Sequence, residues 1–484
     1  MPLLVLFCIF FYLVGVIQAA PTINTTLTST TTTDSFKDPS FTTRTLWSII
    51  SSSVLTLFAC IYSAIHPNIP SPKDSPNCII RRRLGIMIMA LIAPELIVTW
   101  AMRQRICARR VTRQFKKLGY PRIGPESEEK QSVEAPKQRE ICFLRLLVTL
   151  DEGVSHVPVF LWHFPGALAS WVKRSVKAHF SEHSEDDSWT QTHSSFVLMG
   201  GFMLYVDGKP YLTLQPDDIL KLIRKKCIDA PTLTANQIQD KSKGNAISKG
   251  LIMLQVAWFV MQLITRAIYH LETTQLEAGT LAFAVLNFLT YAVWWNKPLN
   301  VRCPHPVYWK STELRPEDHI YVEGDKLAWL GILAPVFRPI AGQIGSHPIH
   351  TSRQLRVPTF DGSIKLEDGE KTVLQLAALL MATIFGCIHC MAWFFAFPTY
   401  QEQMLWRMSA VAITFTPLLC FLVNLTGNLV QRVVVLVCSL MLLVSVMLYI
   451  TARAILLVLM FTTLRNLPPD VYKAVSWISL VPHL

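Results

Sequence analysis

The sequence predicts an all-α integral membrane protein: a bundle of about six or seven transmembrane helices, with cytosolic amphipathic and loop segments. Hydrophobic residues make up 51% of the 484-residue chain, and charged residues only 16%. The hydrophobic residues form long runs instead of following the periodicity of a soluble core. Two of these runs, Gly250–Tyr269 and Ala278–Trp295, are joined by a short segment without Lys or Arg and have basic flanks. This pattern is typical of a transmembrane hairpin whose loop lies outside the cytosol.

The N-terminal residues carry the features of an exported chain. Residues 1–20 are apolar and end in small residues, which is typical of a secretory signal sequence; an uncleaved first helix is the alternative. Residues 21–45 are rich in Thr and Ser and are expected to form a disordered lumenal tail. Asn24 begins an Asn-Thr-Thr sequence in this tail and is a predicted glycosylation site.

The next segment, residues 46–102, holds a first span at Leu46–Ile65 and a second apolar stretch at Leu84–Met102. An Arg triplet precedes the second stretch and a longer basic cluster follows it. A full crossing would therefore place one basic cluster on the lumenal side, against the usual charge bias. A re-entrant or interfacial segment, broken by Pro94, keeps both clusters cytosolic and is the interpretation we favour.

Residues 103–247 form a basic, largely cytosolic region. In its first part, Arg103–Lys117, apolar residues recur at helical spacing among Arg and Lys. We expect an amphipathic helix that either lies on the membrane near anionic headgroups or docks on the protein's own core. Further along, Asp217–Cys227 is predicted to be a short helix, and Thr234 begins a capping box.

The remaining segments alternate between apolar and polar. The hairpin occupies residues 248–296, and residues 297–371 form a cytosolic loop. Residues 372–463 are expected to hold three transmembrane helices, and residues 464–484 an interfacial tail. The loop of the hairpin and the connection after the first of these three helices lack basic residues, so we expect both on the lumenal side.

Several motifs resemble those of uncharacterised multi-pass membrane proteins of filamentous fungi. They are Gln239-Asp240-Lys241-Ser242-Lys243-Gly244, Trp294-Trp295-Asn296-Lys297-Pro298, Ala93-Pro94-Glu95, Met199-Gly200-Gly201-Phe202 and Pro482-His483. The similarity covers residues 45–108 and 189–484. The resemblance implies a fungal protein of this topology and, for members near secondary-metabolite genes, a role in secondary metabolism. It implies no particular reaction.

Polar side chains inside apolar spans are costly and therefore mark candidate functional residues. The candidate intramembrane polar site consists of Glu95, Gln255, Gln262, Arg266, Asn287 and Arg453. Gln255, Gln262 and Arg266 share one face of the first hairpin helix. Asn287 and Tyr291 offer partners from the second. Together they form either a polar seam for a ligand or interhelical hydrogen bonds that only hold the bundle together.

Glu95 is the sharpest single candidate, because a carboxylate at membrane depth needs a partner or a proton. One interpretation is acid–base or proton-coupled chemistry. The other is a re-entrant segment in which Glu95 reaches water or a nearby Arg. Arg453 either pairs with Glu95 or extends to the surface. Thr274 and Glu277 form a capping box, which explains them without a functional role.

No metal site, cofactor or nucleic-acid partner is predicted. Cys387, His389 and Cys390 carry donor atoms, but no second cluster completes four ligands. Weaker His pairs occur at His156 and His163 and at His347 and His350. The net charge of +12 is attributed to basic residues beside apolar runs, where they orient helices and meet membrane lipids.

Three classes of function remain open. The first is binding or movement of a small hydrophobic or anionic metabolite. The second is an intramembrane enzyme of lipid or secondary-metabolite biosynthesis, for example of terpenoids, and the third is a non-catalytic scaffold. The sequence lacks a nucleophile elbow, a phosphate loop and an HExxH motif, so whether the protein is an enzyme stays open. We expect an endomembrane or plasma-membrane location.

Overall fold

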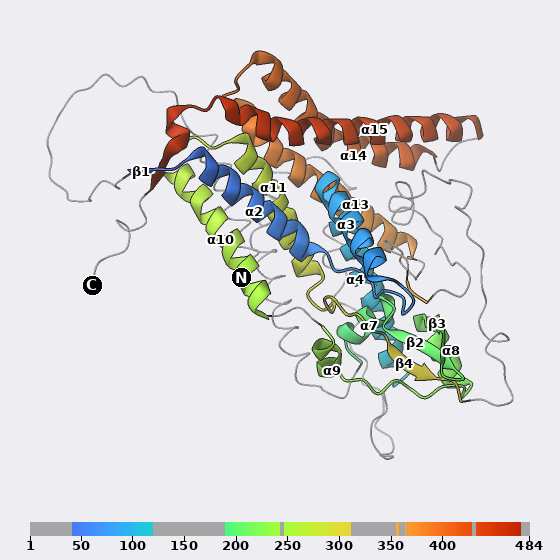
Figure 1. Ribbon diagram of the computed structural model, residues 1–484. Helices are drawn as coiled ribbons and strands as arrows, with labels where there is room; N and C mark the ends of the chain where they lie inside the picture. The colour runs from blue at the N-terminus through green and yellow to red at the C-terminus, as the bar shows by residue number, and fades with distance from the viewer. Residues whose placement is uncertain are drawn as a thin grey trace, which may run out of the picture.

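The computed structural model describes residues 41–119, 189–242, 246–310, 355–357, 364, 366–427 and 432–475. Figure 1 shows long helices packed into a bundle, with a small unit of short helices and strands at one end. The predicted signal sequence, the glycosylation site and several candidate histidines lie outside the described residues: Met1–Ala20, Asn24, His156, His163, His347 and His350.

Within the described residues, five helices are long and apolar enough to cross a bilayer. They include α2 (Leu46–Ala64), α11 (Gln275–Val293), α13 (Asp368–Met391), α14 (Tyr400–Gly427) and α15 (Arg432–Thr462). This count of five is below the expected six or seven, and it rises to six if the bent pair α3–α4 forms one span. The first hairpin helix accounts for the difference, because its described apolar part, Leu254–Ile268, is shorter than a full crossing.

The two helices of the predicted hairpin do not pack mainly against each other. α10 (Ala246–Ile268) packs chiefly against α2, and α11 packs chiefly against α2 and α4. The blue helix α2 therefore lies between them (Figure 1). The sequence predicts the two helices and their short connection, but not the third helix that separates them.

The second apolar stretch is broken where Pro94 predicts a break. α3 (Pro76–Ile92) and α4 (Pro94–Lys117) meet at Ala93 with a bend of 113°. Proline disfavours the helical conformation in the residue before it, and Ala93 has φ −141° and ψ 75°. The pair forms either a broken span or a re-entrant loop.

α11, α13, α14 and α15 surround the apolar core of the bundle, in which Phe283, Phe385 and Trp406 are buried. Gly386 allows α13 and α14 to approach closely. A Cβ atom at this position would lie 2.8 Å from Cα of Thr414. The absence of a side chain therefore sets the spacing of these two helices.

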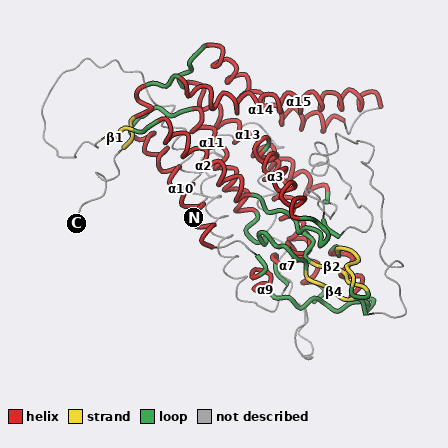
Figure 2. The backbone as a smooth tube through the Cα atoms, viewed as in Figure 1, coloured by secondary structure: helices red, strands yellow, loops and turns green. Residues whose placement is uncertain are grey.

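The described part of the chain is mostly helical, as expected, and the small unit adds a few short strands that were not predicted (Figure 2). β2 (Phe202–Val206) pairs with β3 (Lys209–Thr213) in antiparallel fashion and with β4 (His305–Tyr308) in parallel fashion. Asp207 and Gly208 have positive φ and form the tight turn between β2 and β3. An Asp-Gly pair between two short apolar runs is a hairpin pattern that our sequence analysis missed.

Three short helices complete the small unit: α7 (Gln191–Leu198), α8 (Pro216–Arg224) and α9 (Ala235–Asp240). The capping box at Thr234 is confirmed, and α8 confirms the short helix predicted from Asp217 onward. Cys107, Val111 and Phe115 of α4 are buried in the core of this unit. α4 thus belongs both to the bundle and to the small unit.

Three parts of the chain come together at one end of the bundle, which we call the loop end. They are the α10–α11 connection, the α13–α14 connection and the C-terminal segment after α15. Gln275 Nε2 donates a hydrogen bond to the carbonyl of Ala396 (2.7 Å), and Arg465 pairs with Glu402 (2.7 Å). The two loops predicted to share one side of the membrane therefore lie at the same end.

A short sheet closes the loop end. β1 (Phe41–Thr43) pairs in antiparallel fashion with β5 (Lys473–Val475), which follows the short 3₁₀ helices η5 (Thr463–Arg465) and η6 (Pro469–Tyr472). The last residues of the predicted disordered tail, 41–43, are thus ordered as a strand. Backbone hydrogen bonds to β5 provide the order that their composition does not predict.

The structure predicts that a methyl group at Gly386 weakens the bundle. In Gly386→Ala the new Cβ collides with Thr414, so α13 and α14 must separate, at a cost of about 1–3 kcal/mol. Gly369→Ala, on the same helix but with open space around it, is the matched control. We expect a lower midpoint of thermal unfolding in detergent for Gly386→Ala only; equal midpoints for the two variants would contradict the close approach.

Candidate functional site

A pocket of about 290 Å³ opens at the loop end of the bundle. The α10–α11 connection, the end of α13 with the short 3₁₀ helix η4 (Ala392–Phe394), and the segment between η5 and β5 surround it. Its walls are mainly apolar, and its polar groups come from the α10–α11 connection and the adjoining helix ends. The lining residues are Leu263, Arg266, Ala267, His270, Leu271, Glu272, Thr273, Gln275, Ala278, Leu281, Met391, Phe394, Phe395, Ala396, Leu467, Pro468 and Val471.

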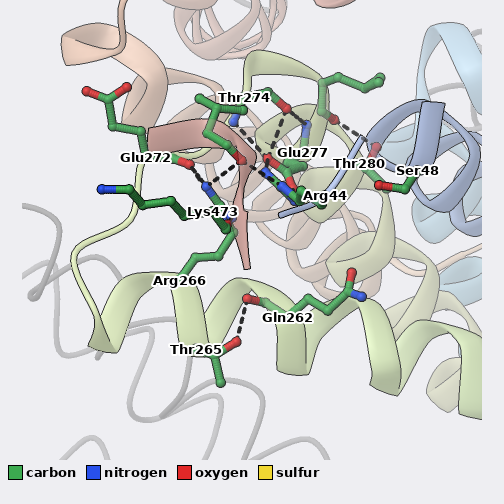
Figure 3. A network of polar contacts seen from close by, with 12 residues as sticks. Arg44, Ser48, Gln262, Thr265, Arg266, Glu272, Thr274, Glu277, Thr280 and Lys473 are labelled. Carbon is green, nitrogen blue, oxygen red and sulfur yellow. Dashed lines mark hydrogen bonds and ion pairs between the residues drawn. The ribbon is translucent and has the colours of Figure 1, made fainter. Parts of the chain in front are cut away.

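Arg266 lines this pocket and is held in place by backbone carbonyls (Figure 3). Its Nε donates to the carbonyl of Glu272 (3.0 Å) and its Nη1 to that of Lys473 (2.7 Å). Its Nη2 donates to the carbonyls of Asp470 (3.3 Å) and Val471 (3.1 Å). These bonds tie the C-terminal segment to the end of α10, and they leave the charge of the guanidinium without a directly bonded carboxylate.

An ion pair between Arg44 and Glu277 lies beside Arg266. Arg44 makes two hydrogen bonds with the carboxylate of buried Glu277 (2.6 and 3.2 Å), whose second oxygen also caps Thr274 (2.9 Å). The predicted capping box is therefore confirmed, and it also anchors Arg44. Figure 3 shows the guanidinium groups of Arg44 and Arg266 on either side of this region. Arg266 also feels the negative charges of Glu272 and Asp470 at the rim.

Glu272 provides an acidic group at the rim of the pocket. Burial, together with the negative charge of nearby Asp470, raises the pKa of the Glu272 carboxyl above its ordinary value. His270, which adopts a positive φ of 53°, ends the helix at the same rim. The rim therefore holds titratable groups, whereas the interior of the pocket is apolar.

Glu95 and Arg453 lie in a second cluster, deeper in the bundle. Oε1 of Glu95 accepts a hydrogen bond from the hydroxyl of Tyr449 (2.7 Å), and its buried Oε2 has no hydrogen-bond partner. Tyr449 lies one helical turn before Arg453 on α15. The structure therefore brings the two sequence candidates into one cluster, with a tyrosine between them.

Arg453 neither forms a direct pair with Glu95 nor extends to the surface. It is fully buried, and its guanidinium donates to the carbonyls of Ile92 (3.0 Å) and Leu91 (3.1 Å) at the end of α3. Nη1 also contacts Nε2 of His389 (3.3 Å), and the ring of Phe385 lies 4.5 Å away. The arginine satisfies carbonyls that the helix break leaves without helical partners.

The other polar candidates do not line a common seam. Gln255 Nε2 donates to the hydroxyl of Thr56 on α2 (3.1 Å), whereas Asn287 Nδ2 donates to the Phe283 carbonyl of its own helix (2.9 Å). Gln262 lies on α10 near the pocket arginine in Figure 3. Since α2 separates α10 from α11, these side chains cannot meet across the hairpin.

The basic helix Arg103–Lys117 docks on the protein's own core, which was one of the two alternatives left open. Several of its cations are used inside the protein. Arg105 donates to the carbonyls of Ala292 (3.0 Å) and Val293 (3.2 Å), and Arg110 pairs with Glu370 (2.5 Å). The exposed cations of this helix are Arg109, Arg113, Lys116 and Lys117, on one face.

Lys297, within the Trp-Trp-Asn-Lys-Pro motif, is a buried residue that our site prediction did not include. Nζ donates to the carbonyl of His66 (2.5 Å) and to Oε1 of Gln104 (2.9 Å). The rings of Trp100 and Trp294 lie 4.9 and 4.6 Å from it. These partners are neutral, and burial lowers the pKa of Lys297 well below its ordinary value. The only sequence indication was its place in the motif.

His389 and its neighbouring cysteines have structural contacts. Nδ1 of His389 bonds with the carbonyl of Phe385 (2.9 Å), and Nε2 faces Arg453, so both ring nitrogens are engaged. Cys387 is exposed and Cys390 is half-buried on the same helix. Among the described residues, no group of three His, Cys, Asp or Glu side chains is arranged to hold a metal ion.

Replacing Arg453 should weaken the protein more than replacing another helix arginine. In Arg453→Met the carbonyls of Leu91 and Ile92 lose their donors, at a cost of about 3 kcal/mol. Arg407→Met, which removes a half-buried arginine from beside Trp393, is the control. We expect a much lower thermal midpoint in detergent for Arg453→Met; a midpoint like that of the control would mean that the helix break does not depend on the guanidinium.

The comparisons with known proteins identify a family without assigning an activity. No curated protein and no solved structure matches the chain. The profile of one family, DUF8562, described as a family of unknown function, matches residues 6–149 and 169–314. These residues include α2, α3, α4, the small unit and the α10–α11 pair. Since the match covers more than half of the chain, the protein belongs to the DUF8562 family.

Proposed function

We propose that the protein is a multi-pass integral membrane protein that binds a small hydrophobic anion in the pocket at the loop end. The observation that carries this proposal is the combination of apolar walls with the cationic Arg266 in one pocket. An apolar cavity with a few convergent polar groups is the usual form of a small-molecule site. The volume of about 290 Å³ suits a small ligand with one anionic group.

The Glu95 cluster supports this choice indirectly. Arg453 bonds to the carbonyls that end α3 and so serves the helix break, whereas Glu95 bonds to the hydroxyl of Tyr449. Arg266, in contrast, keeps its charge at the wall of a cavity. We therefore assign ligand recognition to the loop end and not to the membrane interior.

Exposed apolar side chains favour insertion in a bilayer. Large apolar side chains that are more than 50% exposed project from α2, α14 and α15: Leu55, Phe58, Met408, Phe415 and Met447. An apolar face this large suits contact with lipid and not with water. The exposed cations of α4, beginning with Arg109, lie just beyond this apolar region and suit anionic lipid headgroups. A location in the endomembrane system or the plasma membrane, reached through the N-terminal signal sequence, completes the proposal.

A bulky side chain in the pocket tests the proposal. In Ala267→Phe the ring fills part of the cavity, so binding of radiolabelled decanoate to the purified protein in nanodiscs should weaken by about tenfold or more. Ala257→Phe places the same ring on the exposed face of the same helix and should bind like wild type. Decanol, which has the same chain length but no charge, should bind more weakly than decanoate because it lacks the attraction to Arg266.

Equal decanoate binding by Ala267→Phe and Ala257→Phe, with both variants folded, would contradict binding in this pocket. Equal binding of decanol and decanoate would contradict the role of the positive charge.

The rim carboxylate should make binding depend on pH. Glu272 has a raised pKa, so it is neutral at lower pH and becomes a carboxylate as the pH rises through that value. Ionisation repels an anionic ligand, and binding of decanesulfonate, which stays ionised, should therefore weaken as the pH rises. In Glu272→Gln this dependence should shrink. An unchanged pH profile in Glu272→Gln would exclude Glu272 as the titrating group.

A further inference from the structure

The bent pair α3–α4 enters the bundle and leaves it at the same end. The segment that leads into α3 is bonded to the small unit, where the N–H of Ile69 donates to the carbonyl of Met199 (2.9 Å). The last turns of α4 return to the same unit, and Phe115 lies in its core together with Ile69. Ala93, at the break, is therefore the turning point. In the membrane setting proposed above, the pair forms a re-entrant loop and not a span.

The tip of this loop lies near the middle of the bilayer. Oε1 of Gln104 accepts a hydrogen bond from Lys297 just after the end of α11, so Gln104 marks the level where α11 finishes. From Gln104 to Glu95, α4 rises by about 13 Å, and a hydrocarbon core is about 30 Å thick. Arg453 gives the same depth, because its guanidinium lies 5.3 Å from the ring of Phe283 in the middle of α11.

The carboxyl group of Glu95 is buried at this tip with few donors around it. Glu95 is only 8% exposed. Its Oε1 accepts a hydrogen bond from the hydroxyl of Tyr449 (2.7 Å), and its own backbone N–H also faces the carboxyl group. Oε2 has no hydrogen-bond partner among the described residues. A carboxylate shares its negative charge between both oxygens, so the ionised form would leave charge on an oxygen without a donor, in apolar surroundings.

The other charged and titratable groups around Glu95 offset this cost only in part. Arg453 on α15 provides a positive charge that acts on Glu95, but its guanidinium bonds to the carbonyls that end α3 and contacts His389 of α13. The N-terminus of α4 also favours a negative charge at this position. The surroundings therefore allow the carboxyl group to ionise, whereas the oxygen without a donor favours the neutral acid. A group in this balance can take up a proton and release it.

Broken helices that place an ionisable side chain near the midplane are a recurrent form of site for Na⁺ or H⁺ in membrane proteins. A metal cation does not fit here, because the carbonyls at the end of α3 already accept bonds from Arg453 and its positive charge repels a cation. We propose that Glu95, at the tip of the re-entrant loop, is a proton-binding site, with the proton on Oε2 and the Tyr449 hydroxyl bonded to Oε1. This site is separate from the pocket at the loop end and needs only the membrane setting of the proposed function.

Infrared absorption tests the proposal on the full-length protein in dodecyl maltoside, a detergent without a carbonyl group. At about pH 7.5, exposed carboxyl groups are ionised, so a neutral carboxyl group is recognised by its own C=O stretching band. We expect the wild type to show such a band, shifted in D₂O, and Glu95→Gln to lack it. Glu367→Gln removes a carboxylate that is 79% exposed and should leave the band unchanged.

Tyr449→Phe provides a second variant if Glu95→Gln does not fold. It removes the hydrogen bond to Oε1, so the band should move to higher frequency. Absence of the band in the wild type, as expected for an ionised Glu95 that water solvates, would overturn the proposal. Persistence of the band in Glu95→Gln, or an unshifted band in Tyr449→Phe, would also overturn it.

Release of the proton is tested in the same samples. The band should fade as the pH is raised towards about 10 and return when the pH is lowered, with the amide bands unchanged. A band that stays constant over this range would mean a carboxyl group that never releases its proton, and would contradict a binding site. Decanoate binding, measured on the same preparations, reports on the loop end independently, so failure of one proposal is distinguishable from failure of the other.

Discussion

The guanidinium of Arg453 fixes the part of the structure on which the rest depends. A chain that bends by 113° at Ala93 leaves carbonyls at the end of α3 without helical partners, deep inside a bundle of apolar helices. Water cannot satisfy such groups there, so another part of the chain must. Arg453 donates to two of them from α15. The bend then directs α4 along α13 and into the small unit, whose core contains its apolar face.

The elements that could be predicted are those whose structure depends only on their own segment of the sequence. Long apolar runs predict α2, α11 and α13–α15, and Pro94 predicts the break. Position along the chain does not predict neighbours: α2 separates α10 from α11 although a short connection suggests a simple pair. The strands β1 and β5 were also missed, because each is short and is ordered only by the other, at the far end of the sequence.

The same holds for the candidate sites: single polar residues could be predicted, whereas a cavity between distant segments could not. Arg266, Glu95 and Arg453 were visible because polar groups in apolar runs are costly, although the sequence does not show that Arg453 bonds to helix carbonyls and Arg266 borders a cavity. The cavity at the loop end was invisible, since its walls come from the α10–α11 connection, the end of α13 and the segment before β5, which lie far apart in the sequence. Sites formed by distant segments need the fold before they can be recognised.

The place of α2 between α10 and α11 has a consequence for biosynthesis. α2 emerges from the ribosome long before its two neighbours, and it exposes Ser53 and Thr56, which are buried in the finished bundle. Until α10 arrives, the hydroxyl of Thr56 lacks the amide of Gln255. α2 therefore stays without its final neighbours until α10 and α11 have been made, and the pairing of β1 with β5 forms only after α15 has been made.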